Sequence, residues 1–198
     1  MALIEGTNCG FVTVAPSVDP DGEGTGQIDN LSAGFRVVAP VGATAITEIG
    51  WYCPAASEAA NFQVGLYSHD AVNDEPEARL VVSADTAKGT EAGWKLASVS
   101  LAITVGTTYW ICVQCDDTAT VTTIDRTNTA GERQVYKTSE GASENLIDPW
   151  GASDGSSERL LAIYVVYTTA GGGIDTAKKR MSATHLLVPS YPMAILPD

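Results

Sequence analysis

The sequence predicts an all-β domain, either a sandwich or a barrel, over residues 1–170. Short β-type runs recur along this region, separated by turns rich in Gly, Asp, Asn, Ser and Thr. No stretch of it sustains the apolar spacing of three and four residues that is typical of an amphipathic helix. Hydrophobic residues make up 44% of the 198-residue chain and charged residues only 18%, which is enough apolar material for a core. Strands that are short and separated by turn signals are typical of all-β sandwiches and barrels.

Alternation of side chains with a period of two locates the strands. Over residues 61–68, for example, Phe62, Val64 and Leu66 lie on one predicted face and the residues between them lie on the other. In chain order, we expect strands at residues 11–15, 34–39, 45–53, 61–68, 79–84, 93–101, 107–115, 119–124, 133–138 and 160–168. Polar, turn-rich connections are expected at residues 19–26, 70–77, 88–91 and 139–158.

Three consecutive glycines, residues 171–173, mark a boundary after the domain, because glycine is flexible and has no side chain to pack. Residues 174–198 are expected to form an extended C-terminal arm, since Pro189, Pro192 and Pro197 disfavour a helix. The arm is too apolar to stay free in water, so we expect it to pack on its own domain or on a neighbouring subunit. The arm residues expected to make these contacts are Lys178, Lys179, Arg180, Leu186, Leu187, Tyr191, Met193 and Ile195.

The charge of the chain restricts its partners. A net charge of −13 repels the phosphates of DNA and RNA, so a nucleic-acid partner is not expected. The longest apolar runs, such as residues 162–167, are far too short to span a bilayer, so no membrane partner is expected either. Residues 171–198 carry a small basic excess against a strongly acidic remainder. That tail could dock on an acidic neighbouring copy, or the acidic surface could serve only solubility.

Four cysteines raise the question of redox or metal chemistry. Cys112 and Cys115 have the spacing of a redox or zinc pair, but they lie in a strand-like run, where residues three apart point to opposite faces. Buried free thiols are the expected state for all four. In an oxidising medium, a disulfide joining Cys9 to Cys53, or Cys53 to Cys112, remains an alternative.

An acidic turn at residues 19–23 offers carboxylates at Asp19, Asp21 and Glu23. Calcium prefers several oxygen ligands on a bendable loop, yet the spacing is not that of an EF-hand. The sequence therefore leaves open whether this loop binds calcium or is simply an acidic turn, and we expect no cofactor.

No catalytic constellation is recognisable in the chain. His69 and His185 have no accompanying pattern of nucleophile, base and orienting group. Hydrolase and phosphate-loop motifs do not occur. We therefore expect a protein without enzymatic activity, although a glycosidase would need only two carboxylates, which leave little trace in a sequence.

Trp150 is the tryptophan best suited to bind a ligand. Trp51, Trp94 and Trp110 lie in strand-like runs and are expected to pack in the sheets, whereas Trp150 follows Pro149 in a polar loop. An exposed ring there would be a possible glycan contact. The alternative is that the ring packs on the sandwich and anchors the loop.

Two sets of residues carry a resemblance to known proteins. The runs at residues 48–53, 61–68, 93–94 and 107–111 resemble jelly-roll domains of the carbohydrate-binding-module type, in which a strand like Gly65-Leu66-Tyr67 pairs with one like Thr108-Tyr109-Trp110. Related segments occur in virion proteins of tailed bacteriophages. The tail at residues 177–183, with Pro189 and the closing residues 197–198, resembles a short motif of phage structural modules. That motif usually continues past its Pro-Asp pair, so the natural product could extend beyond Asp198.

The resemblance implies an antiparallel β-sandwich of jelly-roll type and a role as a bacteriophage virion structural protein on the particle exterior. We expect a homotrimeric capsid decoration (auxiliary head) protein, attached partly through its arm to the major capsid protein or other virion subunits. The start of the chain has neither a basic segment nor a long apolar one, as expected of a protein made in the host cytoplasm and released with the virion. The alternative is a tail-fibre or host-surface glycan-binding module.

Overall fold

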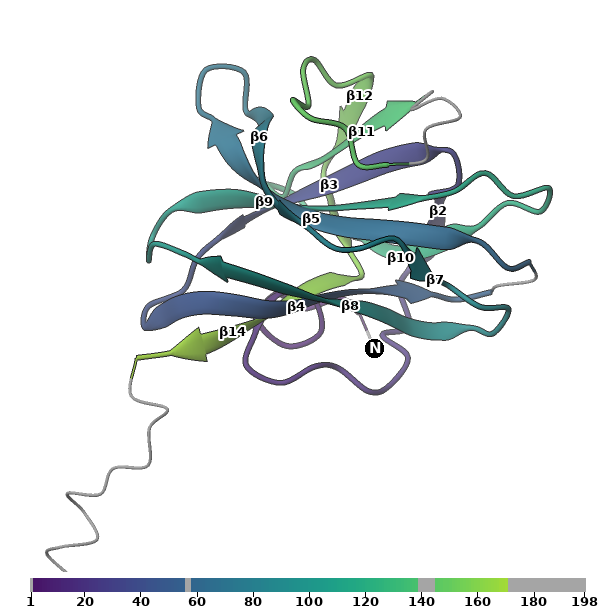
Figure 1. The fold of residues 1–198 in the computed structure, drawn as a ribbon, viewed down its shortest axis with the longest axis horizontal. Helices are drawn as coiled ribbons and strands as arrows, with labels where there is room; N and C mark the ends of the chain where they lie inside the picture. Colours follow the sequence, from purple (N-terminus) through teal and green to yellow (C-terminus); the bar gives the residue numbers. More distant parts are fainter. Residues whose placement is uncertain (1, 56–57, 139–144, 171–198) are drawn as a thin grey trace, which may run out of the picture.

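A computed structural model describes residues 2–55, 58–138 and 145–170, and this part of the chain is an all-β sandwich without helices (Figure 1). One sheet has the strand order β1-β14-β4-β8. It is built from β1 (Gly10–Val12), β4 (Ala43–Cys53), β8 (Gly93–Ala102) and β14 (Ile163–Thr169). Its pairs are antiparallel except for β1 and β14, which run parallel.

The larger sheet has the order β12-β11-β3-β9-β5-β6. It contains β3 (Leu31–Val38), β5 (Asn61–Asp70), β6 (Glu75–Val82), β9 (Thr108–Cys115), β11 (Gln134–Thr138) and β12 (Gly155–Ser157), and the short β7 (Thr86–Ala87) also pairs with β5. A small third sheet has the order β13-β10-β2, formed by β2 (Gly24–Gln27), β10 (Thr123–Asn128) and β13 (Arg159–Leu161). All pairs in these two sheets are antiparallel.

The two faces of the larger sheet bury different clusters, as strand alternation requires. Phe35, Phe62 and Ile111 belong to the main core, which they share with Trp51 and Ile49 of the first sheet. The alternate residues of the same strands belong to a second, smaller cluster on the other face. That cluster consists of Tyr67, Trp110, Cys112, Val135, Leu146 and Trp150. The loop residues Leu146 and Trp150 therefore cover a face that would otherwise be exposed.

The predicted β-sandwich is confirmed, and most predicted strands appear with shifted ends. The strand predicted at residues 119–124 is wrong in its position, because β10 begins at Thr123 and continues to Asn128. Residues before it are held instead by local bonds, such as the one from the Thr118 hydroxyl to the Thr120 carbonyl at 2.6 Å. The short strands β2, β7 and β12 were not predicted, and the strand predicted at residues 160–168 is divided into β13 and β14. β6 starts at Glu75 and includes Pro76, which an edge strand tolerates.

Among the described residues, no helix has the length and apolar character needed to cross a membrane. The predicted linker at residues 171–173 and arm at residues 174–198 lie outside the described residues.

Candidate functional site

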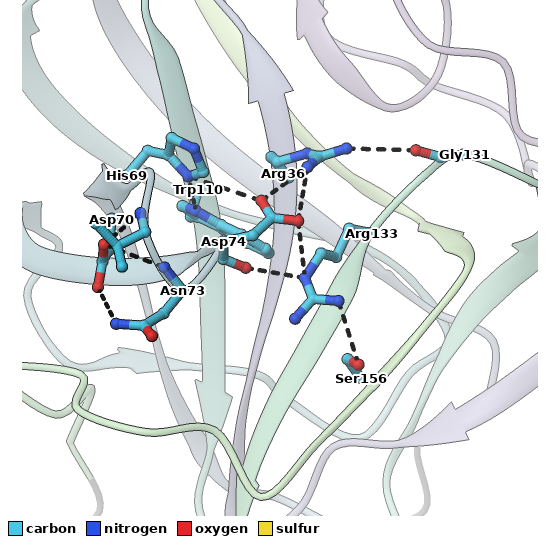
Figure 2. Close-up of polar contacts among 10 residues, drawn as sticks. Arg36, His69, Asp70, Asn73, Asp74, Trp110, Gly131, Arg133 and Ser156 are labelled. Carbon is cyan, nitrogen blue, oxygen red and sulfur yellow. Dashed lines mark hydrogen bonds and ion pairs between the residues drawn. The ribbon is translucent and has the colours of Figure 1, made fainter.

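A group of charged side chains ties the hairpin of β5 and β6 to two other strands of the larger sheet (Figure 2). The Asp74 carboxylate accepts two hydrogen bonds from Arg36 Nη1, at 2.7 and 2.8 Å. Arg133 Nε lies 3.2 Å from Asp74 Oδ2 and donates to the Asp74 carbonyl at 2.8 Å. We call this group the Asp74 clasp. Because Arg36 lies on β3 and Arg133 directly precedes β11, the clasp joins three segments that are distant in sequence.

The hairpin turn presents Asp74 to the two arginines. Asp70 Oδ1 accepts hydrogen bonds from the backbone N–H groups of Val72 and Asn73, at 2.8 and 3.3 Å, which shapes the turn. The Asp74 N–H donates to the Asp70 carbonyl at 2.8 Å. Asp74 has a φ of 55°, in the left-handed region that Asp and Asn tolerate better than most residues. The Asn73 side-chain amide, which donates to Asp70 Oδ2 at 2.6 Å, and the backbone N–H groups hold the pKa of the Asp70 carboxyl below its ordinary value.

His69 lies beside the clasp and is fixed by a tryptophan (Figure 2). The Trp110 indole N–H donates to His69 Nδ1 at 3.2 Å, so this nitrogen carries no proton in that geometry. His69 Nδ1 is 3.9 Å from Asp74 Oδ1. A histidine whose Nδ1 accepts from an indole cannot donate from that atom to a carboxylate, so the order of groups found in a catalytic triad is not present here. The clasp is best understood as a device that holds the sheet together.

A second pair of arginines borders a cleft between the small sheet and the larger one. Its walls include Arg126 of β10 and Arg159 of β13 on one side, and Gln134 and Tyr136 of β11 on the other. Its volume is about 170 Å3. We call it the arginine cleft. Leu31, Ala33, Ile124 and Leu161 supply its apolar lining.

Arg126, one of these two arginines, lies against the glycines of β2. Arg126 extends along β2, and its Nε donates to the Thr25 carbonyl at 2.8 Å. A Cβ at Gly26 would lie 3.6 Å from Arg126 Cδ, and one at Gly24 would lie 3.8 Å from its Nη2. These are ordinary van der Waals distances, so the Arg126 side chain lies directly against the two glycines. The sequence Gly24-Thr25-Gly26, which looks like a turn, is thus part of a strand against which Arg126 of β10 lies.

Asn128 joins the two arginines of the cleft. Its Oδ1 accepts hydrogen bonds from Arg126 Nη1 at 3.0 Å and from Arg159 Nε at 3.3 Å. Register explains the arrangement, because Arg159 pairs with Asn128, and Arg126 lies two residues before Asn128 on the same face of β10.

Trp150, the predicted glycan contact, is fully buried. Its ring packs edge-on against Tyr67 with 5.4 Å between centroids, and its Nε1 donates to Ser153 Oγ at 2.9 Å. A buried ring offers no face to a sugar in this conformation. The geometry is that of the alternative interpretation, in which Trp150 anchors its loop.

The predicted contact residues of the arm are outside the described residues. Lys178, Lys179, Arg180, Leu186, Leu187, Tyr191, Met193 and Ile195 all belong to this undescribed segment, as does His185.

The four cysteines are free and buried. Cys115 belongs to the main core and Cys112 to the smaller cluster, so they point to opposite faces of β9, as predicted. A bridge from Cys53 to Cys112 is therefore not compatible with this fold. Cys9 precedes β1 and Cys53 ends β4, with β14 between those strands. Two inter-strand spacings, about 10 Å, therefore separate β1 from β4. A disulfide spans a Cα separation of at most roughly 7 Å, so a bridge from Cys9 to Cys53 does not fit this arrangement.

In the acidic turn at residues 19–23, Asp19 uses both carboxylate oxygens within the protein. Asp19 Oδ1 accepts from the Asp21 N–H at 2.8 Å, and its Oδ2 accepts from the Tyr52 hydroxyl at 2.7 Å. These hydrogen bonds lower the pKa of Asp19. No group of three or more His, Cys, Asp or Glu side chains with the geometry of a metal site occurs in the described ranges.

One hollow of about 390 Å3 contains a carboxyl group with a raised pKa, the property expected of a glycosidase acid. Burial raises the pKa of Asp116, which lies there beside Asp117. Both oxygens of Asp116 are engaged, since Oδ2 accepts from the Asn61 N–H at 3.2 Å and Oδ1 accepts from Gln114 Nε2 at 3.4 Å. The contacts of Asp116 are those of a residue that fixes the start of β5.

Comparison with known proteins adds no relative: the chain matches no family model, no curated protein and no solved structure at a significant level. The resemblance to phage virion proteins therefore stays an expectation.

Sequence reasoning missed both arginine groups. Asn73 and Asp74 were recognised only as parts of a turn, and Arg126 and Arg159 were not singled out. The one available signal was the rarity of basic residues, with 11 Lys and Arg against 24 Asp and Glu. In so acidic a chain, an arginine without a carboxylate partner indicates a candidate anion-binding position.

Proposed function

We propose that this protein is a bacteriophage virion structural protein on the particle exterior, and specifically a capsid decoration protein. The sandwich would face solvent, and the arm at residues 174–198 would lie on the shell or on a neighbouring subunit. A homotrimer is the proposed assembly, with the major capsid protein or another virion subunit as the partner. The proposed location is the virion, after synthesis in the host cytoplasm.

The observation that carries the proposal is an open edge close to the point where the chain leaves the sandwich. β8 is ten residues long, pairs only with β4 among the described strands, and has one charged side chain, Lys95. The edge strand β6 of the other sheet differs, because it contains Pro76 and several charged residues. Natural sheets use proline and charge to block edges, so β8 is the edge that can accept another extended segment.

The exit of the chain supports the same proposal. Thr168 of β14 pairs with Ala45 of β4, and Ala45 pairs with Ala102 at the end of β8. A segment paired on the open side of β8 would therefore lie three strand spacings from β14, roughly 14 Å. The four Cα–Cα steps from residue 170 to residue 174 can span about 14 Å. An arm starting at residue 174 can thus reach this edge on its own sandwich or on an adjacent copy.

The free thiols are also consistent with a protein made in a reducing compartment. All four cysteines are unpaired and buried, and burial raises the pKa of each thiol. The sandwich thus owes its stability to its packed core and not to disulfides, which would form only in an oxidising medium.

The decisive experiment is mass-spectrometric quantification of the chain in purified particles, relative to the major capsid protein. A copy number comparable to that of the capsid protein would support decoration of the shell. A far lower copy number would favour a tail or fibre component, and absence from particles would overturn the proposal.

A truncation tests the arm. Deletion of residues 171–198 is expected to abolish attachment to particles while the sandwich keeps its thermal transition. Attachment of the truncated protein at the level of the full chain would reject the role of the arm.

Glycan binding is the second candidate. Trp150 does not support glycan binding, because its ring is buried. The variant Trp150→Ala is also no test of glycan binding, because loss of a buried ring would disturb the fold in any case. The observation that favours glycan binding is the arginine cleft.

A further inference from the structure

The arginine cleft holds positive charge that the described protein does not neutralise. Arg126 and Arg159 share one acceptor, Asn128 Oδ1, and an amide oxygen carries only a partial charge. None of the ion pairs within 4.0 Å among the described residues involves either arginine. Two neighbouring cations in a chain with a net charge of −13 are therefore left without a carboxylate.

The carboxylate nearest in sequence is turned away from the cleft. Asp125 precedes Arg126 on β10, so its side chain points to the opposite face of the strand. There it is buried, and its Oδ2 accepts a hydrogen bond from the Gly22 N–H at 3.2 Å. The β10 backbone thus separates this negative charge from the two guanidinium groups.

The rest of the cleft suits a compact ligand with a partly apolar body. Leu31 and Leu161 contribute apolar surface, and Tyr136 contributes a half-buried ring. Gln134 lines the same cleft, and its buried Oε1 has no hydrogen-bond partner. Its volume of about 170 Å3 restricts the cleft to a small ligand, such as one ring carrying a charged group.

The geometry points to the arginine cleft as a binding site for the carboxylate of an acidic monosaccharide unit, a uronate. Guanidinium groups bind carboxylates through paired, charge-assisted hydrogen bonds, and Arg126 and Arg159 present two of them side by side. The C–H face of the sugar ring would pack on Leu31 and Tyr136. A long polyanion is disfavoured by the net charge, whereas a single carboxylate is repelled little, because salt screens charges beyond about 8 Å. This inference is independent of the virion proposal.

Calorimetric titration of the full chain with sodium glucuronate tests the inference, with glucose, acetate and inorganic phosphate as the other arms. Glucuronate is expected to bind at least about tenfold more tightly than glucose, which lacks the carboxylate, and than acetate, which lacks the ring. Equal binding of glucose would overturn the role of the arginines. Equal or tighter binding of acetate or phosphate would reduce the cleft to a simple anion site and overturn the sugar assignment.

Matched variants locate the site. Asn128→Asp would place a carboxylate between the two arginines and is expected to weaken glucuronate binding at least about tenfold, without lowering the thermal transition. Arg159→Gln is expected to weaken binding similarly. Lys95→Met removes one positive charge from β8 in the other sheet and should leave binding unchanged. Wild-type affinity in Asn128→Asp, or an equal loss in Lys95→Met, would overturn the assignment.

Discussion

Two pairs of arginines in this sandwich each share one acceptor residue, but the acceptors differ in charge. In the Asp74 clasp, Arg36 and Arg133 converge on a carboxylate. In the arginine cleft, Arg126 and Arg159 converge on the amide of Asn128. The two acceptors differ by one group, an oxygen in place of an NH2. In this comparison, the arginine pair that meets a carboxylate is partly neutralised within the fold, whereas the pair that meets an amide keeps both positive charges.

The surroundings of the two pairs support this distinction. The clasp carries one residual positive charge, and Glu132 and Glu158 line the hollow of about 310 Å3 beside it. The cleft carries two positive charges, and its lining contains no acidic residue. Four predictions test the comparison through stability, from the largest expected effect to the smallest.

Asp74→Asn gives the clasp the composition of the cleft. Removal of the charge shared by Arg36 and Arg133 is expected to cost about 2 kcal/mol, because both guanidinium groups lose a charge-assisted partner. In a domain of this size, that loss lowers Tm by roughly 4–8 °C in differential scanning calorimetry. The control is Asp85→Asn, an exposed carboxylate whose oxygen can still accept from Asn61. Equal effects of the two changes would show that the clasp adds nothing special.

Arg36→Met and Arg126→Met compare one arginine from each pair. Arg36→Met leaves Asp74 with one guanidinium and is expected to cost about 1 kcal/mol. Arg126→Met removes a cation that repels Arg159, so the free energy of unfolding should stay within about 0.5 kcal/mol of the wild type. Urea denaturation at neutral pH measures both. A larger loss in Arg126→Met would contradict the idea that the cleft is not structural.

Asn128→Asp gives the cleft the composition of the clasp. A carboxylate between Arg126 and Arg159 is expected to add about 0.5 kcal/mol of stability at neutral pH, since the site is partly exposed. The two arginines would lower the pKa of the new carboxyl below its ordinary value of about 3.9. A lowered pKa means that the gain is present at neutral pH and is lost as the pH falls through that pKa. Thermal unfolding from pH 7 to pH 3 checks this, and a gain that survives at pH 3 would refute the electrostatic cause.

Asp125→Asn should give the smallest effect, which is also confined to neutral pH. Burial, followed by the charges of Asp19 and Asp21, raises the pKa of Asp125. A raised pKa disfavours the folded state once the carboxyl ionises, so the amide variant should be more stable at pH 7 by less than about 0.5 kcal/mol, or less than roughly 2 °C in Tm. The difference should disappear below the ordinary value of 3.8. Glucuronate binding should not change, because Asp125 lies on the other face of β10.

Alternation within strands was sufficient to predict much of the fold. It placed Cys112 and Cys115 on opposite faces, and it assigned Trp51 and Trp110 to packed positions. Alternation needs only local information, because the two faces of a strand are fixed by the backbone. It failed for Gly24–Gln27, where glycines look like a turn and the strand exists because β10 pairs with it.

The two arginine groups could not be predicted from the sequence, because each is assembled by pairing between distant strands. Arg36 and Asp74 are separated by 38 positions, and Arg159 and Asn128 by 31. A sequence shows that arginines are few, but not which of them meet an acid. The burial of Trp150 is a similar case, since its polar neighbours gave no sign of the Tyr67 ring beneath it.

The buried cysteines make the native protein a blank background for site-specific labelling. Maleimide dyes react with accessible thiolates, and all four native thiols are buried with raised pKa values. A cysteine introduced at Val72, which is 91% exposed at the tip of the β5–β6 hairpin, would therefore be the sole fast-reacting position. A fluorophore attached there would lie two residues from Asp74, where its anisotropy would report the opening of the clasp in real time.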